Sequence, residues 1–180
     1  MRKGTDSEQL YRFIEHTFRT HQSELFRAKE LCVEISSLID GLSLFVQRHT
    51  EQICPHCENV CCINKHSYNA YDDIVYLCGL GERIVPRKKG IADSEACQFL
   101  GEKGCTIRHS LRPYRCTWYF CSPLLEQIGM DELTEYRKFI SLLELITRTR
   151  GRLLDEFEGV LKTAGNQRPS EKKCYSETGR

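Results

Sequence analysis

The chain has 180 residues and a mass of 21.0 kDa, enough for one domain or for one domain with an appended module. Its 26 basic and 25 acidic residues give a net charge of +1, which provides no global field to attract nucleic acid or an anionic membrane. No apolar run approaches the roughly 20 residues of a membrane span, and no hydrophobic signal core follows the N-terminus. We therefore expect a soluble, cytoplasmic protein with no nucleic-acid partner and no membrane partner.

Residues 1–50 are predicted to form an N-terminal helical arm. The arm opens with the run TDSE at residues 5–8, a capping-box pattern. Apolar side chains then recur every three or four positions, interrupted only by His21, at Tyr11, Ile14, Phe18, Leu25, Ala28, Cys32, Ile35, Ile39, Leu42 and Val46. A repeat of about 3.5 residues predicts a coiled-coil seam that another helix must cover. Two interpretations of this long arm stay open: a break near residues 20–23 that creates a third helix, or a surplus seam that forms a homodimer.

Residues 126–164 are predicted to form a C-terminal helical arm. Its apolar positions are Leu133, Tyr136, Ile140, Leu143, Leu154, Phe157 and Leu161, and the pattern fails at Thr147 and Arg150. Two such arms on either side of a compact middle would pack as an antiparallel hairpin or small bundle, so we expect a mainly-α fold. The polar residues 165–180 are expected to form a flexible tail in which Cys174 is free.

Residues 51–125 are predicted to be a cysteine-rich, loop-dominated metal-binding module. The chain has 11 cysteines, and a reducing compartment would not stabilise them as disulfides. Eight of them form a tight C-x2-C-x3-C-C cluster and a widely spaced second half: Cys54, Cys57, Cys61, Cys62, Cys97, Cys105, Cys116 and Cys121. Paired thiolates at such spacing hold zinc and iron–sulfur centres, so we predict that all eight are metal ligands. They could form two four-thiolate sites, or one site with further thiols nearby.

The remaining cysteines and histidines have more ordinary interpretations. Cys32 lies on the apolar seam and is expected in the core, whereas Cys78, at the end of a predicted helix over residues 67–78, is either buried or a spare thiol. His56 could replace a thiolate, but an exposed loop histidine is the favoured interpretation. His66 and His109 are expected to be surface groups or to lie behind the ligands.

Other side chains of the module bear on the charge and water access of such a site. Four cations in the second half either compensate a site of net negative charge or are ordinary surface charges: Lys103, Arg108, Arg112 and Arg115. Trp118, Tyr119 and Phe120 lie between two predicted ligands and are expected to shield the site from water.

These residues resemble a bacterial and archaeal family of zinc- or iron-chelating domains with eight cysteines. The eight cysteines named above match the family's eight one for one, and its intervening signature is matched by Leu100, Ile107, Arg112, Pro113 and Arg115. The resemblance covers residues 54–123 and not the helical arms. It implies a metal-chelating domain; some members are described as iron–sulfur oxidoreductases, and a relative that methylates flagellin lysines carries the domain. This chain has no glycine-rich loop for S-adenosylmethionine, so that activity is not carried over.

The ligand spacing favours iron–sulfur over zinc. Zinc usually takes two C-x2-C pairs for each site, and this chain has one such pair and an irregular second half. We therefore expect a [4Fe–4S] cluster in a redox or cluster-carrying protein that acts with an unidentified protein partner. The alternative is a structural Zn2+ module with a helical interaction surface, and the least favoured is part of an S-adenosylmethionine-linked protein-modifying system. No catalytic constellation is visible, so enzymatic activity is not predicted beyond an oxidoreductase-type role.

Overall fold

The computed structural model describes residues 3–57, 60–88, 90–102 and 104–165. The α-helices are α1 (Lys3–Thr20), α2 (Phe26–Ile53), α3 (Tyr71–Leu80), α4 (Arg115–Trp118), α5 (Ser122–Gly129) and α6 (Leu133–Thr163). Short 3-10 helices are η1 (Cys54–His56), η2 (Asn64–His66) and η3 (His109–Leu111), and β1 (Leu100–Gly101) pairs antiparallel with β2 (Gly104–Cys105). The expectation of a mainly-α fold is confirmed. No helix in the described ranges combines the length and apolarity needed to cross a bilayer.

The N-terminal arm breaks between α1 and α2, close to the predicted position. The Leu25 amide still donates to the carbonyl of His21 at 3.0 Å, so the connection is one tight turn of chain. Short polar residues such as Thr20 and Ser23 have weak helix propensity because their side chains compete for backbone hydrogen bonds. The third-helix interpretation is therefore confirmed, and the homodimer stays a prediction.

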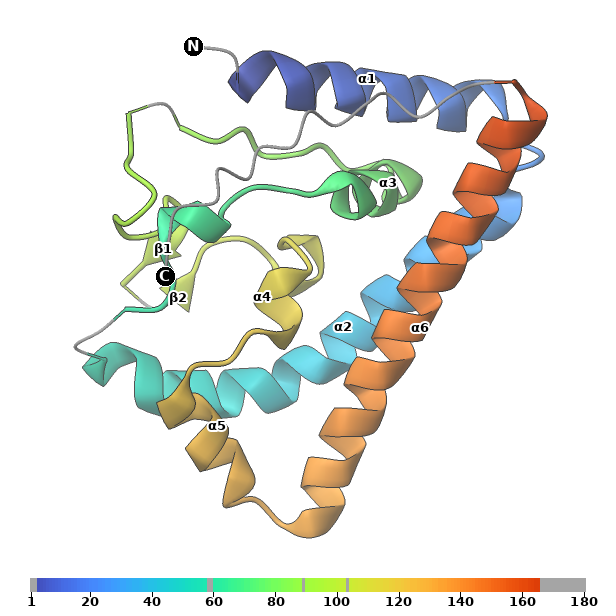
Figure 1. Cartoon of the computed structure of the whole chain (residues 1–180). Coiled ribbons are helices and arrows are strands. Elements are labelled where there is room, and N and C mark those ends of the chain that lie inside the picture. Colours follow the sequence, from blue (N-terminus) through green and yellow to red (C-terminus); the bar gives the residue numbers. More distant parts are fainter. Residues whose placement is uncertain (1–2, 58–59, 89, 103, 166–180) are drawn as a thin grey trace, which may run out of the picture.

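The two long helices α2 and α6 pack against each other in antiparallel orientation (Figure 1). Near the end of α2, Phe45 stacks on Phe139 with ring centroids 4.6 Å apart. Near its beginning, Glu34 accepts a hydrogen bond from Thr149, much further along α6. Late residues of α2 thus meet early residues of α6, which is the geometry of an antiparallel helical hairpin.

The predicted seam of the N-terminal arm is the centre of the core. All ten of its apolar residues are buried, and His21, its one interruption, is partly exposed. Cys32 is 0% exposed, which confirms its place in the core. A Cβ atom at Gly79 of α3 would lie 2.4 Å from the Cys32 sulfur, so this glycine permits the close approach of α3 to α2.

The predicted seam of the C-terminal arm is wrong over the first turns of α6. Leu133 and Tyr136 are 62% and 38% exposed, whereas the buried face consists of Phe139, Ile146, Thr149, Arg150, Leu153, Phe157 and Leu161. Adjacent leucines at 142–143 and 153–154 allow two helical registers, and hydrophobicity alone does not distinguish them. Arg150, which the pattern counts as a failure, is only 5% exposed.

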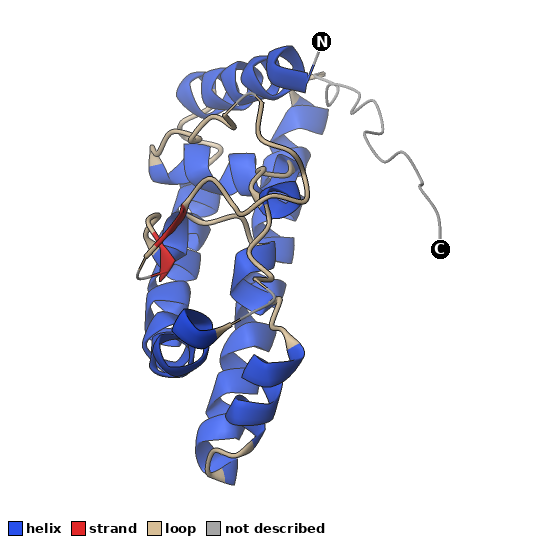
Figure 2. Ribbon diagram, turned by 90° about the vertical axis from the view of Figure 1, so that its left-hand side faces the viewer, coloured by secondary structure: helices blue, strands red, loops and turns tan. Residues whose placement is uncertain are grey.

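The middle of the chain lies between α1 on one side and α2 with α5 on the other (Figure 1). Figure 2 shows that much of it is loop, in contrast with the long helices beside it. The predicted helix over residues 67–78 is α3, which begins later at Tyr71, because Asp73 accepts from the Ala70 amide and caps the helix there. Residues 166–180, including the predicted tail and Cys174, lie outside the described ranges.

Replacing Ile39 with aspartate tests the buried seam of α2. Ile39 is 2% exposed, so Ile39→Asp buries an unpaired carboxylate and should lower the free energy of unfolding by at least about 3 kcal/mol. Leu44, on the same helix but 74% exposed, supplies the matched control, and Leu44→Asp should change it by no more than about 0.5 kcal/mol. Urea denaturation followed by circular dichroism measures both. Equal stability of the two variants would contradict this packing.

Candidate metal centre

The first four of the eight predicted ligands follow directly after α2. Cys54 begins η1, and the Cys57 amide donates to its carbonyl at 3.3 Å. Cys61 and Cys62 lie in an irregular segment that leads into an isolated antiparallel bridge between Ile63 and Ala96. The cysteine cluster therefore begins at the C-terminal end of α2, which ends at Ile53.

The other four predicted ligands come from four local structures. Cys97 continues the bridge, since its amide donates to the carbonyl of Cys62 at 2.8 Å. Cys105 lies on β2 opposite Leu100, Cys116 lies on α4, and Cys121 is the N-cap residue of α5. These elements return the late cysteines to the neighbourhood of the early ones.

The thiols interact across these segments. Partial burial, together with the neighbouring Cys61, Cys121 and Cys57, raises the pKa of the Cys54 thiol above its ordinary value. The pKa of the Cys61 thiol is raised to about 12, mainly by burial and then by the neighbouring Cys62 and Cys121. The Cys61 side chain also shares hydrogen bonds with the side chains of Cys62 and Cys121. Thiols from residues 54–62 therefore lie close to the thiol that precedes α5.

A second set of interactions involves the later cysteines. The pKa of the Cys62 thiol is raised to about 11, mainly by burial and then by the neighbouring Cys116, Cys54 and Cys97. The pKa of the Cys116 thiol is raised to about 12, mainly by burial and then by the neighbouring Cys105, while the positive charge of Arg112 opposes the rise. All eight predicted ligands therefore belong to one region of neighbouring thiols.

This arrangement is not itself a coordination sphere. Among the described residues, no group of three or more histidine, cysteine, aspartate or glutamate side chains is positioned to hold a metal ion. The described cysteines form no disulfide, and Cys54 and Cys62 are exposed at the surface. The donor chemistry fits a soft metal, since thiolates select zinc and iron–sulfur clusters. Rotation about the Cα–Cβ bond moves a cysteine sulfur without moving the backbone, so neighbouring thiols can converge on an ion.

The histidines have separate environments. His56 is exposed, as its favoured interpretation predicted. His66 contacts Arg115 at 3.3 Å and lies beside the ring of Tyr119. His109 is 8% exposed, so the surface interpretation is wrong for it; burial and then Arg112 lower its pKa to about 4, and its ring hydrogen-bonds the Cys116 backbone.

The cations of the module also differ in their roles. Arg108 pairs with Asp40 of α2 and Arg115 donates to the Tyr68 hydroxyl at 2.8 Å, so both have protein partners. Arg112 donates to the carbonyl of Ile107 at 2.8 Å and acts electrostatically on Cys116. Arg112 is thus the described arginine best placed to compensate a negative site, while Lys103 lies outside the described residues.

The predicted aromatic shield is only partly present. Trp118 is 51% exposed and Tyr119 is 49% exposed, so neither excludes water from the cysteines as expected. Phe120 instead packs on Phe139 of α6, with ring centroids 5.5 Å apart. The short α4 ends at Trp118 and turns these two rings outward, which anchors Phe120 alone in the core.

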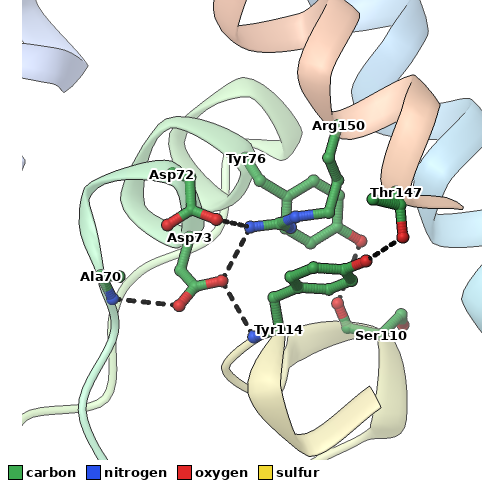
Figure 3. A network of polar contacts seen from close by, with 8 residues as sticks. All are labelled: Ala70, Asp72, Asp73, Tyr76, Ser110, Tyr114, Thr147 and Arg150. Atoms are coloured by element: carbon green, nitrogen blue, oxygen red, sulfur yellow. Dashed lines mark hydrogen bonds and ion pairs between the residues drawn. The ribbon is translucent and has the colours of Figure 1, made fainter. Parts of the chain in front are cut away.

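A buried ion-pair network ties the cysteine-rich module to α6 (Figure 3). Arg150 donates to Asp72 at 2.7 Å and to Asp73 at 2.9 Å, both at the start of α3. The Asp73 oxygen that binds Arg150 also accepts from the amide of Tyr114 at 2.9 Å, two residues before Cys116. Burial raises the pKa of Asp73, and Arg150 is the largest influence that opposes this rise.

Two tyrosine rings complete the surroundings of this arginine. The Arg150 guanidinium carbon lies 4.3 Å from the ring centroid of Tyr114 and 5.5 Å from that of Tyr76. The Tyr76 hydroxyl donates to the Ser110 carbonyl at 3.0 Å, and the Tyr114 hydroxyl lies 2.5 Å from the Thr147 hydroxyl. The backbone on either side of Arg112 is therefore held from both α3 and α6.

Sequence reasoning missed this network because its members are far apart in the chain. The one available signal for the network was Arg150 itself, because a charged residue stands there at a position where the helical pattern predicts an apolar side chain. An arginine there requires a buried acidic partner, and the pair Asp72–Asp73 lies at the start of the other predicted helix.

Removing the arginine should destabilise the fold. Arg150→Leu leaves Asp73 buried without its cation and should lower the free energy of unfolding by about 3–5 kcal/mol. Adding Asp73→Asn removes the orphaned charge and should restore part of that loss. Arg152→Leu, at an exposed position on the same helix, should have little effect. Denaturation curves of the four proteins measure this, and a silent Arg150→Leu would contradict the role of the network.

Comparisons of the chain with known protein families, curated proteins and solved structures found no match. The resemblance of residues 54–123 to the eight-cysteine family therefore stays a prediction. The chemistry assigned to this region rests on its own residues and their contacts.

Proposed function

We propose that this protein binds metal through its eight clustered cysteines and that the metal is an iron–sulfur cluster of the [4Fe–4S] type. The observation that carries the proposal is the mutual interaction of thiols from separate segments, such as Cys61 with Cys121 and Cys62 with Cys116. Structural cysteines of a core would be dispersed among apolar residues, as Cys32 is. Several thiols that neighbour one another at a surface are typical of a metal site.

The choice of iron–sulfur over zinc rests on ligand type and spacing. Two histidines of the module have other partners: His109 is buried against the Cys116 backbone, and His66 contacts Arg115 at 3.3 Å. A set of thiols with one C-x2-C pair and four widely spaced members fits cluster ligation better than two zinc knuckles. When bound, such a cluster would supply one-electron redox chemistry or iron and sulfide for transfer.

Accessibility supports a role that involves a protein partner. Cys54 and Cys62 are exposed, and Trp118 and Tyr119, between two of the predicted ligands, expose about half of their surface. A redox or carrier protein must bring its cluster close to that of its partner, which a deeply buried site prevents. Exposed aromatic side chains are common at protein interfaces, so this face is the proposed contact surface.

A structural zinc module is the second candidate, and the irregular backbone of the module favours it. The strands β1 and β2 have two residues each, and long stretches around them form no regular structure. Such a segment buries little apolar surface of its own, and a bound metal would supply the missing folding free energy. The helical hairpin would then be the interaction surface.

Purification of the full chain without oxygen distinguishes the two candidates. An iron–sulfur protein should be brown, contain acid-labile sulfide, and show partial bleaching of its visible absorption on reduction by dithionite, because the cluster accepts the electron. Zinc is closed-shell and has no redox step, so a zinc protein would be colourless and unaffected by dithionite. Cys174→Ser, outside the eight, should keep the full absorption and serves as the matched control.

A colourless anaerobic preparation with stoichiometric zinc and no sulfide would overturn the iron–sulfur proposal in favour of the structural one. A preparation with neither metal, which also fails to take up zinc or iron and sulfide, would overturn metal binding altogether. Zinc found after purification in air decides nothing, since oxygen destroys an accessible cluster and leaves thiols that bind zinc.

A further inference from the structure

The order of the cysteines in the sequence suggests a division into the first four and the last four, but their contacts do not follow that order. Cys121, the last of the eight, interacts with Cys54 and Cys61, which belong to the first four. Cys62, one of the first four, interacts most strongly with Cys116, then with Cys54 and then with Cys97. The partners of Cys121 thus lie in the first half, and the strongest thiol partner of Cys62 lies in the second half.

The backbone explains why Cys121 joins the early cysteines. Cys121 is the N-cap residue of α5, and its carbonyl accepts the amide of Leu125 at 2.9 Å. Helix α5 packs on α2, whose C-terminal end leads directly into Cys54. The start of α5 and the end of α2 thus bring the two cysteines together, and the buried Leu124 and Ile128 fix α5 in that position.

The backbone equally explains why Cys62 joins the later cysteines. Its carbonyl accepts the amide of Cys97 at 2.8 Å, next to the bridge between residues 63 and 96. The carbonyl of Cys97 in turn accepts the amide of Leu100 at 2.8 Å, and Leu100 pairs with Cys105 across the small sheet. Cys116 interacts with both Cys105 and Cys97, which completes the set.

We propose that the eight thiols form two interleaved four-thiolate sites, of which the first uses Cys54, Cys57, Cys61 and Cys121 and the second uses Cys62, Cys97, Cys105 and Cys116. The inference rests on the proposed metal binding and adds the number of sites and the ligands of each. The boundary between the sites passes between the adjacent Cys61 and Cys62, which also interact with each other. The two centres are therefore neighbours, each held by four thiolates as structural zinc and cubane clusters require.

Paired substitutions in the full chain test this division, with Zn2+ alone as the probe. The metal-free, reduced parent should bind two zinc ions per chain. Cys57→Ser/Cys121→Ser removes two ligands of the first site only and should bind one. Cys57→Ser/Cys62→Ser removes one ligand from each site and should bind none tightly. Bound zinc is counted by elemental analysis after gel filtration, and Cys174→Ser is the control.

The opposite result would overturn the interleaved division. If the sites followed sequence order, Cys57→Ser/Cys62→Ser would keep one zinc and Cys57→Ser/Cys121→Ser would keep none. Loss of all zinc from both variants, or one zinc in the parent, would replace two sites with a single one. A parent that binds no zinc and no cluster would contradict the proposed function itself, so the two failures are distinguishable.

Circular dichroism shows, independently of the zinc count, whether a variant has unfolded. The helices α2 and α6 contain none of the eight cysteines, so helical circular dichroism should persist in every variant. A second pair of variants, Cys54→Ser/Cys121→Ser and Cys105→Ser/Cys121→Ser, repeats the comparison with Cys121 instead of Cys57 as the shared substitution. The first should keep one zinc and the second none, and any other pattern would overturn the division.

Discussion

The pairing of Arg150 with Asp72 and Asp73 is the interaction on which the relation between arms and module depends. A cation and a carboxylate that are both almost fully buried are stable together but costly apart, because each alone would lack its hydration. The pair joins α6 to α3, and through the Tyr114 amide it reaches the segment that carries Cys116. The network therefore contacts both the helical core and the segment that leads to Cys116.

The N-terminal half of the fold was predictable because the spacing of apolar residues along the sequence determines it. An apolar residue every three or four positions specifies the buried face of a helix, and all ten predicted positions from Tyr11 to Val46 are buried. In the C-terminal arm the apolar pattern is interrupted by Arg150, and the doubled leucines of α6 allow two registers. There the face is chosen by partners about 80 residues away, which no local pattern contains.

The same distinction applies to the candidate site. Clustering of cysteines in the sequence predicts that residues 51–125 form a module, because C-x2-C spacing is a local feature. Which thiols become neighbours depends on where α5 and the bridge at residue 63 return the chain, and this is a property of tertiary packing. The outward rings of Trp118 and Tyr119 depend likewise on where a single helical turn ends.

The position of Arg150 along the chain has a consequence for biosynthesis. All eight clustered cysteines leave the ribosome before Arg150 does, since the last of them is residue 121. Until that arginine arrives, Asp73 lacks its cation and the segment around Tyr114 lacks its support from α6. The contacts that join the module to α6 can therefore form only after all eight cysteines have been synthesised.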